Sequence, residues 1–223
     1  MAHPHLHRSV FIPGPAGRLE ALLWTSARPN PPVAAVICHP HPLFGGTMHN
    51  KVVFRVARSL DRLGLPTLRF NFRGTGLSEG AHDRGRGEQD DVRAALDFLA
   101  AEFPRVPLLV AGFSFGCWVG LRVGCADARV IELIGLGAPV NDSDFSYLSS
   151  CEKPRLLIQG EEDPYGSPAK LKVLVESFPE AVRRETQIVV VPAAGHFFAG
   201  ALDQVDRAVT DWLMALHPNL RGK

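Results

Sequence analysis

The chain has 223 residues, of which 46% are hydrophobic and 21% charged, and its formal net charge is +1. This length allows one domain with a sizeable core, and the near-zero charge argues against nucleic acid or a membrane surface as partner, so we expect chemistry on a small molecule. The four cysteines form no Cys-x-x-Cys pair, and neither a signal peptide nor a long apolar run occurs, so we expect a cytoplasmic protein.

The hydrophobic pattern switches repeatedly between two periods along the chain. Short, continuous apolar runs are typical of strands that are covered on both faces. Between these runs, apolar residues recur at helical spacing. In chain order, the predicted elements are strands at residues 10–12, 19–24 and 33–38, a helix over 52–64, a strand at 66–72, a helix at 88–103, a strand at 108–111, a helix at 117–127, strands at 130–137 and 156–159, a helix at 171–178, a strand at 187–191 and a helix at 202–216.

This alternation predicts an α/β fold with a mostly parallel sheet and helices on both of its faces. The first two strands, joined by a loop rich in Pro and Gly, are expected to form an antiparallel edge. We expect one domain over residues 10–217, with flexible tails at 1–9 and 218–223. Residues 138–155 are too few to hold the several helices of an inserted cap domain, so none is expected.

The sequence between the strand at 108–111 and the following helix reads Gly-Phe-Ser-Phe-Gly, with Ser114 at its centre. A strand that turns sharply into a helix holds its apex residue in a strained backbone conformation, and glycines two positions away leave room for it. Ser114 is therefore predicted to be a nucleophile. A serine hydroxyl is a weak nucleophile at neutral pH, so it needs a base and a group that orients the base.

Two candidate partners follow later strands. His196 comes just after the last predicted strand, and Asp163 follows the strand at 156–159, with Glu161 and Glu162 as competitors for the same role. Because parallel sheets place their sites at the carboxyl ends of the strands, these side chains are expected at one edge together with Ser114. His196 is predicted to act as general base and Asp163 to orient it.

The order serine, acid, histidine is that of the α/β-hydrolase superfamily, which the chain resembles from about residue 10 to residue 216. It is more specifically similar to compact bacterial α/β-hydrolases that lack a cap. The motifs that carry this likeness are HPHP at residues 39–42, GGTMHNKVV at 45–53 and RFNFRGTGLSEG at 69–80. The resemblance implies a hydrolase and leaves its substrate open.

Acyl transfer also requires N–H donors for the oxyanion of the tetrahedral intermediate. The backbone N–H of Phe115, next after the nucleophile, is one predicted donor. Superfamily members usually carry His-Gly-x after the first central strand, whereas Pro40 and Pro42 at this place have no N–H to donate. We expect the second donor to be His41, with Leu43 as the alternative.

Aromatic side chains near these positions, Phe44, Phe145 and Phe197, are predicted to line a substrate pocket. His39 and His41 suggest a metal, but no third ligand or carboxylate base follows at the usual spacing, so no metal is expected.

Arg69 and Arg73 are expected to bind carbonyl or carboxylate groups of the protein rather than an anionic substrate. We therefore expect a serine hydrolase that cleaves small carboxylic esters or thioesters through an acyl-enzyme on Ser114. It would need no cofactor, take a small-molecule ester as substrate and act as a monomer or homodimer. A non-catalytic binding or scaffolding protein of this fold, and an amidase or peptidase, remain as alternatives.

Overall fold

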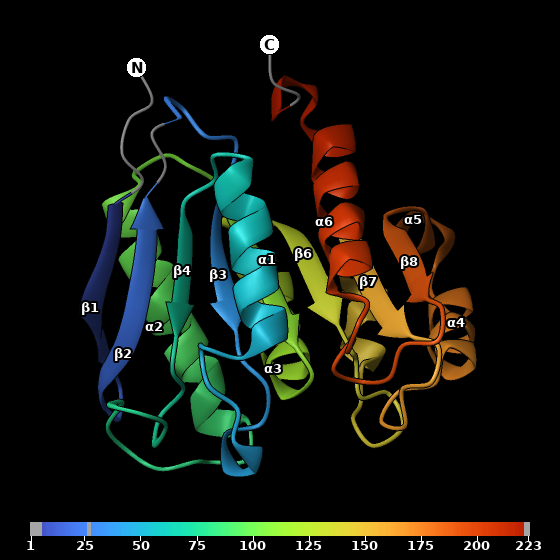
Figure 1. The fold of residues 1–223 in the computed structure, drawn as a ribbon, viewed down its shortest axis with the longest axis horizontal. Helices are drawn as coiled ribbons and strands as arrows, with labels where there is room; N and C mark the ends of the chain where they lie inside the picture. The colour runs from blue at the N-terminus through green and yellow to red at the C-terminus, as the bar shows by residue number, and fades with distance from the viewer. Residues whose placement is uncertain (1–5, 26–27, 221–223) are drawn as a thin grey trace.

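The computed structural model describes residues 6–25 and 28–220. Its centre is an eight-stranded sheet in the order β1-β2-β4-β3-β5-β6-β7-β8, with helices on both faces (Figure 1). The fold predicted from the sequence, a single α/β domain around a mostly parallel sheet, is confirmed. Among the described residues, no helix has the length and apolar composition needed to cross a bilayer.

The elements alternate along the chain as the hydrophobic pattern predicts. The strands are β1 (Leu6–Gly14), β2 (Gly17–Thr25), β3 (Ala34–Cys38), β4 (Thr67–Phe70), β5 (Leu108–Phe113), β6 (Val130–Leu136), β7 (Arg155–Gly160) and β8 (Thr186–Val191). The α-helices are α1 (Lys51–Arg62), α2 (Arg86–Glu102), α3 (Phe115–Ala126), α4 (Pro168–Glu176), α5 (Glu180–Arg184) and α6 (Leu202–Leu216). The 3-10 helices are η1 (Pro42–Phe44), η2 (Ser146–Ser150) and η3 (Pro218–Leu220).

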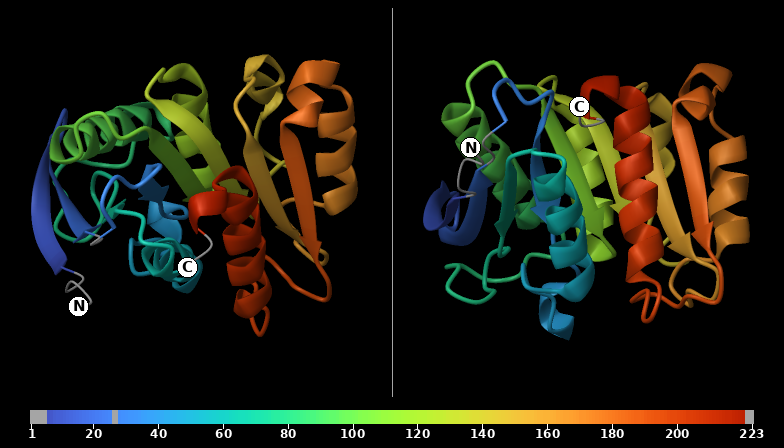
Figure 2. Two further views of the ribbon diagram at one scale, coloured as in Figure 1. Left: turned by 90° about the horizontal axis from the view of Figure 1, so that it is seen from above. Right: turned by 45° about the horizontal axis from the view of Figure 1, so that its top comes forward.

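Strands β1, β2 and β4 pair antiparallel, and all pairs from β4 to β8 are parallel. The strands from β3 to β8 consequently run in one direction, and the labelled arrowheads of β3, β4, β6, β7 and β8 point to one edge, at the bottom of Figure 1. The loops that follow these strands therefore meet at this edge, where a parallel sheet is expected to carry its site. One buried cluster packs α2, α3, α4 and α5 on one face, and a second packs α1 and α6 on the other (Figures 1 and 2).

The first and last regular elements extend into the segments that were expected to be tails. Strand β1 begins at Leu6 rather than residue 10, because its first residues pair with the end of β2 and His7 stacks on Trp24 with ring centroids 4.3 Å apart. At the other end, η3 follows α6 directly and buries Leu220. Residues 6–9 and 218–220, which were expected in tails, therefore belong to regular elements, and the rest of the expected tails, residues 1–5 and 221–223, lies outside the described residues.

Other differences are local. Helix α3 begins at Phe115, directly after the nucleophile candidate, and α5 was not predicted because its five residues are too short for a helical hydrophobic pattern. Between β6 and β7 the structure has only η2, so the expectation that no cap domain is inserted there is confirmed.

Candidate active site

Ser114 occupies the turn between β5 and α3 and has φ 56° and ψ −120°, a left-handed conformation that side chains rarely adopt. Two close contacts explain the flanking glycines. A Cβ on Gly112 would lie 2.2 Å from the carbonyl oxygen of Gly116, and a Cβ on Gly116 would lie 2.4 Å from that of His39. The turn is as tight as the sequence pattern predicts, and it presents the Ser114 side chain at the edge of the sheet.

The imidazole of His196 connects Ser114 to Asp163. Its Nε2 lies 2.9 Å from Ser114 Oγ, and its Nδ1 lies 2.8 Å from Asp163 Oδ2. Both His196 and Asp163 are buried. The competing acids are elsewhere, because Glu161 Oε2 accepts the backbone N–H of Ala193 and Glu162 is exposed. The structure therefore brings together the three residues predicted from the sequence.

A fully buried amide, Gln159 at the end of β7, holds the carboxylate of Asp163. Gln159 Nε2 donates to Asp163 Oδ2 at 2.8 Å and to the carbonyl of Gly166 at 2.7 Å, while its Oε1 accepts the N–H of Ala138 at 2.9 Å. The N–H of Tyr165 donates to the other oxygen of Asp163 at 2.9 Å. The sequence analysis did not identify Gln159. The one feature of the sequence that could have indicated its role is that it is a polar residue in an otherwise apolar stretch of strand.

Aromatic rings surround the imidazole of His196. The ring centroid of Tyr165 lies 4.6 Å away, that of Phe113 4.9 Å and that of Phe197 5.2 Å. These rings restrict the orientations that the imidazole can adopt and exclude water from part of its surface. Tyr165 was not predicted as a site residue, because nothing in its neighbourhood in the sequence distinguishes it from a loop residue.

On the other side of Ser114 lies the loop after β3, which contains η1. His41 is the N-cap of η1, and its Nδ1 accepts the N–H of Leu43 at 3.2 Å. Burial, and second the charge of His82, lower the pKa of His41 and favour the neutral ring that can accept this bond. Among the described residues, no acceptor pairs with the backbone N–H of either His41 or Phe115. Both N–H groups are thus available to a ligand.

His39 fixes the start of the same loop from the interior. Its Nε2 accepts the N–H of Phe72 at 2.9 Å, so its Nδ1, 2.6 Å from the carbonyl oxygen of Pro40, carries the proton and donates it. Burial lowers the pKa of His39 to about 4, which keeps the ring neutral. Both ring nitrogens are therefore occupied by backbone groups, and the described residues contain no cluster of three or more metal-ligating side chains.

A cleft of about 500 Å³ opens over Ser114. Phe44 and Phe197 line it as predicted, and both are exposed. Phe145 does not, and its prediction as a pocket residue is wrong: the ring is buried in the core against Tyr147, with centroids 5.8 Å apart. The residues that line the cleft are Pro40, His41, Phe44, Gly45, Gly46, Asn50, Ser114, Phe115, Pro139, Asp142, Ser143, Tyr165, His196 and Phe197.

The two arginines considered from the sequence bind protein groups. Arg73 Nη2 donates to Asp91 Oδ1 at 2.8 Å, and Arg69 Nη1 donates to the carbonyl of Met48 at 3.0 Å. Arg69 also lies over the ring of Trp24, 4.4 Å from its centroid. Neither side chain lines the cleft, in agreement with the structural role predicted for both.

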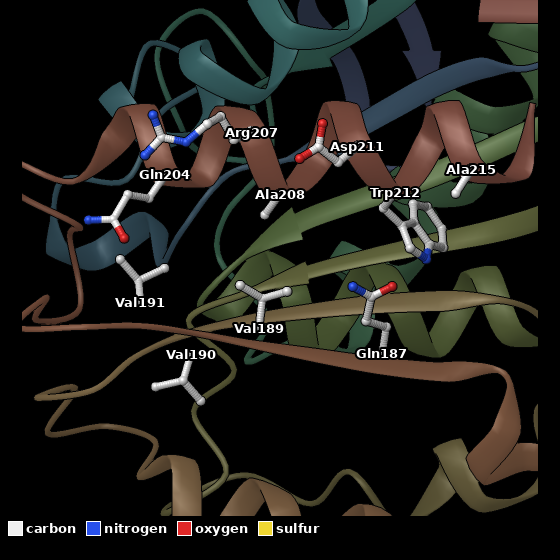
Figure 3. A pocket seen from close by; sticks show the side chains of 10 residues that line it. All are labelled: Gln187, Val189, Val190, Val191, Gln204, Arg207, Ala208, Asp211, Trp212 and Ala215. Carbon is white, nitrogen blue, oxygen red and sulfur yellow. The ribbon is translucent and has the colours of Figure 1, made fainter. Parts of the chain in front are cut away.

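A second hollow, of about 410 Å³, lies between β8 and α6 at the far edge of the sheet, and Figure 3 shows the side chains that line it. It is walled by valines of β8 and by Gln204, Arg207, Asp211 and Trp212 of α6. No serine, cysteine or histidine belongs to its lining, so it lacks the nucleophile and base found in the cleft over Ser114.

Comparisons with known proteins give a matching family model and relatives along most of the chain. The model of the family described as serine aminopeptidase, S33, matches residues 31–150, more than half of the chain. An uncharacterised protein of Rickettsia prowazekii is 34% identical over 215 residues, which cover 94% of this chain and 90% of the relative.

Two solved structures are similar over nearly the whole length. An α/β serine hydrolase without lid from Xanthomonas campestris has a TM-score of 0.86 and 34% identity, covering 98% of each chain. An α/β serine hydrolase homologue from Coxiella burnetii has a TM-score of 0.85 and 35% identity, covering 94% of this chain and 99% of its own. Taken with the fold and the family model, they identify this chain as an α/β serine hydrolase that belongs to the serine aminopeptidase, S33, family.

Proposed function

We propose that this hydrolase cleaves small carboxylic esters or thioesters through an acyl-enzyme on Ser114, with His196 as general base and Asp163 as the acid that orients it. The observation that carries the proposal is the continuous chain of contacts from Asp163 through the imidazole to Ser114 Oγ, at 2.8 and 2.9 Å. Such a chain is what a serine hydroxyl needs to act as a nucleophile at neutral pH.

In the first step, Ser114 Oγ attacks the carbonyl carbon while its proton passes to His196 Nε2. Asp163 accepts the N–H of Nδ1 and so stabilises the imidazolium that forms. Collapse of the tetrahedral intermediate breaks the bond to the alcohol or thiol, which leaves with the proton from Nε2. Water then attacks the acyl-enzyme in the same way, with His196 again as base, and releases the acid.

The oxyanion of each tetrahedral intermediate would accept the N–H groups of Phe115 and His41. Phe115 is the first residue of α3, where the helix dipole adds a favourable partial positive charge. The alternative donor predicted from the sequence, the N–H of Leu43, is already bound to the imidazole of His41. This favours His41 over Leu43 as the second donor.

The lining of the cleft supports an uncharged substrate. Among the described residues that line it, Asp142 supplies the one carboxylate, and no lysine or arginine contributes. Anionic acyl or leaving groups would therefore find no cationic partner. The absence of a cap leaves the cleft open, so long acyl chains would bury little apolar surface, and short chains are expected to react best.

Amide or peptide cleavage is a second candidate, favoured by the description of the family as serine aminopeptidases. The same nucleophile and base would serve, with His196 donating its proton to the departing amine. A chain that keeps these residues without turnover, acting as a binding or scaffolding protein, is the remaining alternative. The proposal also includes a location in the cytoplasm and a monomeric or homodimeric state.

The experiment is a panel of nitrophenyl esters of rising acyl length, a thioester and aminoacyl nitroanilides, assayed with the native chain and with Ser114→Ala. We expect the shortest esters to give the highest kcat/KM and Ser114→Ala to lose both turnover and labelling by a fluorophosphonate. Labelling that survives in Ser114→Ala would falsify the nucleophile. Faster cleavage of nitroanilides than of esters would favour the peptidase, and the lack of an acylation burst would favour the scaffolding alternative.

A further inference from the structure

One wall of the cleft is formed by two loops that are bound to each other. In the loop after β6, Asn141 donates its backbone N–H to the carbonyl of Tyr165 at 3.1 Å and its Nδ2 to the carbonyl of Pro164 at 2.9 Å. Asp142 and Ser143 follow directly in the same loop, and both line the cleft, as does Tyr165. These three residues, Asp142, Ser143 and Tyr165, are called here the polar wall.

The polar wall carries hydrogen-bonding groups that the protein itself does not use. In the described part of the chain, the carboxylate of Asp142 and the hydroxyl groups of Ser143 and Tyr165 make no hydrogen bond or ion pair. The neighbouring acid differs, because Asp144 Oδ1 accepts the backbone N–H of Ser146 at 2.8 Å. One carboxylate and two hydroxyl groups are therefore free to bind a ligand in the cleft.

Two aromatic rings place this wall on the side of the leaving group. The ring centroids of Tyr165 and Phe197 lie 4.6 and 5.2 Å from that of His196, and the two residues are 49% and 59% exposed. In the hydrolysis of an ester, the departing alcohol takes its proton from His196 Nε2, so it must lie against this imidazole. The two rings therefore flank the position of the alcohol.

The charges around the polar wall favour hydroxyl groups over a cation as its ligand. Lys170 Nζ donates to the carbonyl of Asn141 at 3.1 Å, so an ammonium group already lies next to the segment that carries Asp142. The hydroxyl groups of Ser143 and Tyr165 can donate as well as accept, which matches an alcohol, whereas an ammonium ligand can only donate. The polar wall thus fits an uncharged ligand that has several hydroxyl groups.

We propose that the cleft selects its substrate by the alcohol part of the ester, and that this part is a polyol of the size of a monosaccharide. The inference rests on the proposed ester hydrolase. Asp142 accepts hydrogen bonds from hydroxyl groups, Ser143 donates or accepts one, and the rings of Tyr165 and Phe197 cover the C–H face of the polyol. The ester C–O bond breaks, the polyol leaves with the proton of His196 Nε2, and water supplies the hydroxyl group of the released acid.

Selection by the alcohol agrees with the open form of the cleft. Without a cap, the acyl group buries little surface, so the larger part of the binding energy has to come from the part of the substrate that does not react. A cleft of about 500 Å³ is within the usual size of a small-molecule site. Because the polar wall is open to water, we expect selectivity of about tenfold, far below the roughly 10⁴-fold of a closed site built for hydroxyl groups.

The test compares glucose 6-acetate with cyclohexylmethyl acetate, which has the same acyl group and a six-membered ring but no hydroxyl group. We expect kcat/KM to be about tenfold higher for the sugar ester. Asp142→Ala removes the charged acceptor and should bring the ratio of the two kcat/KM values close to one. Asp144→Ala is the matched control and should keep the native ratio, because Asp144 binds Ser146 and does not line the cleft.

A second measurement does not depend on turnover. Ser114→Ala binds an ester without cleaving it, so calorimetry on this variant gives the Kd of glucose 6-acetate directly. Adding Asp142→Ala to it should raise this Kd by about tenfold, which corresponds to one hydrogen bond to a charged group.

Several results would overturn the inference. These are equal kcat/KM values for the two acetates, a ratio that Asp142→Ala leaves unchanged, and a Kd that does not respond to Asp142→Ala. Faster cleavage of acetylcholine than of both acetates would assign the polar wall to a cationic alcohol instead. If nitrophenyl acetate is cleaved in any of these cases, the proposed function still stands. The lack of turnover on every ester, with Ser114 unlabelled by fluorophosphonate, would overturn the proposed function and this inference together.

Discussion

Two regions flank Ser114: His196 with Asp163 on one side, and the loop after β3, called here the oxyanion loop, on the other. The hydrogen-bond acceptors that hold these two regions in place differ in charge. On the side of His196, the acceptor is a carboxylate: Asp163 takes hydrogen bonds from Gln159 and from the N–H of Tyr165 as well as from the imidazole. On the side of the oxyanion loop, the acceptors are two neutral imidazoles, His39 and His41, which take the N–H groups of Phe72 and Leu43.

Because of this difference, the hydrogen bonds on the two sides of Ser114 are expected to be lost under different conditions. An imidazole nitrogen accepts a hydrogen bond only while it is unprotonated, and burial lowers the pKa of both His39 and His41. Acid is thus expected to act on the oxyanion loop by removing acceptors. The side of His196 is more sensitive to substitutions that alter the carboxylate or the amide behind it.

The largest effect is expected for Asp163→Asn. An asparagine fits the same space, but its amide would favour the wrong tautomer of His196 and would not stabilise the imidazolium, so kcat should fall by about 10⁴-fold. Glu161→Gln is the matched control, since Glu161 accepts only a backbone N–H outside the cleft, and it should stay within about twofold of the native chain. Steady-state assays of the two variants on one short ester make the comparison. Equal losses in both would contradict the assignment of the acid.

The oxyanion loop offers a substitution that removes one backbone donor. His41 has φ −54°, which proline can adopt, so His41→Pro deletes the N–H with little strain. We expect kcat to fall by about 10²- to 10³-fold with a small change in KM, the usual cost of one oxyanion donor.

His41→Ala separates the side chain from the backbone. It keeps the N–H but loses the cap of η1, worth about 1 kcal/mol, and should reduce kcat by far less than His41→Pro. If the alanine and proline variants were equally slow, the imidazole rather than the N–H would be the important group. A labelling rate with fluorophosphonate gives an independent measurement of the same difference.

The sequence predicted the three residues proposed to react better than it predicted the residues that hold them in place. Ser114, Asp163 and His196 follow strands, and the rule that parallel strand ends meet at one edge was enough to bring them together. Gln159 could not be predicted, because its partners belong to two loops that are distant in the sequence, Ala138 after β6 and Asp163 and Gly166 after β7.

Two further errors have the same origin. A phenylalanine in a loop can point to the cleft or to the core, and the sequence around Phe145 does not distinguish these. The polar start of β1 likewise gave no strand pattern, since its pairing with β2 supplies the order that its hydrophobicity does not. What the sequence missed in each case was set by contacts between distant segments.

Acid should reduce the stability of the fold through His39. Its pKa is 6.5 as an ordinary histidine and about 4 when folded, so between these values the unfolded chain binds a proton that the folded chain does not. Stability that is present above pH 6.5 is therefore lost as the pH falls toward 4, by about 3 kcal/mol in total. Urea unfolding from pH 7 to 4 measures the free energy of unfolding at each pH, and its slope against pH gives the number of protons that the chain takes up on unfolding. In His39→Gln, which has no titrating ring, this number should fall by about one. An unchanged slope would exclude His39 as the cause.

The smallest effect on catalysis is expected for Gln159→Leu, which keeps the volume of the side chain but removes its hydrogen bonds to Asp163, Ala138 and Gly166. Asp163 retains the N–H of Tyr165, so its orientation loosens without being lost, and we expect kcat to fall by about tenfold while KM changes little. Gln187→Leu, at an exposed position of the neighbouring strand β8 that lines the second hollow, is the matched control and should leave kcat unchanged. A purely structural role for Gln159 would lower the melting temperature with no change in kcat of the folded protein. A fall in kcat with KM preserved instead shows that the Gln159 amide acts through Asp163. The orientation of His196 then depends on the neutral, buried amide that holds the Asp163 carboxylate in place.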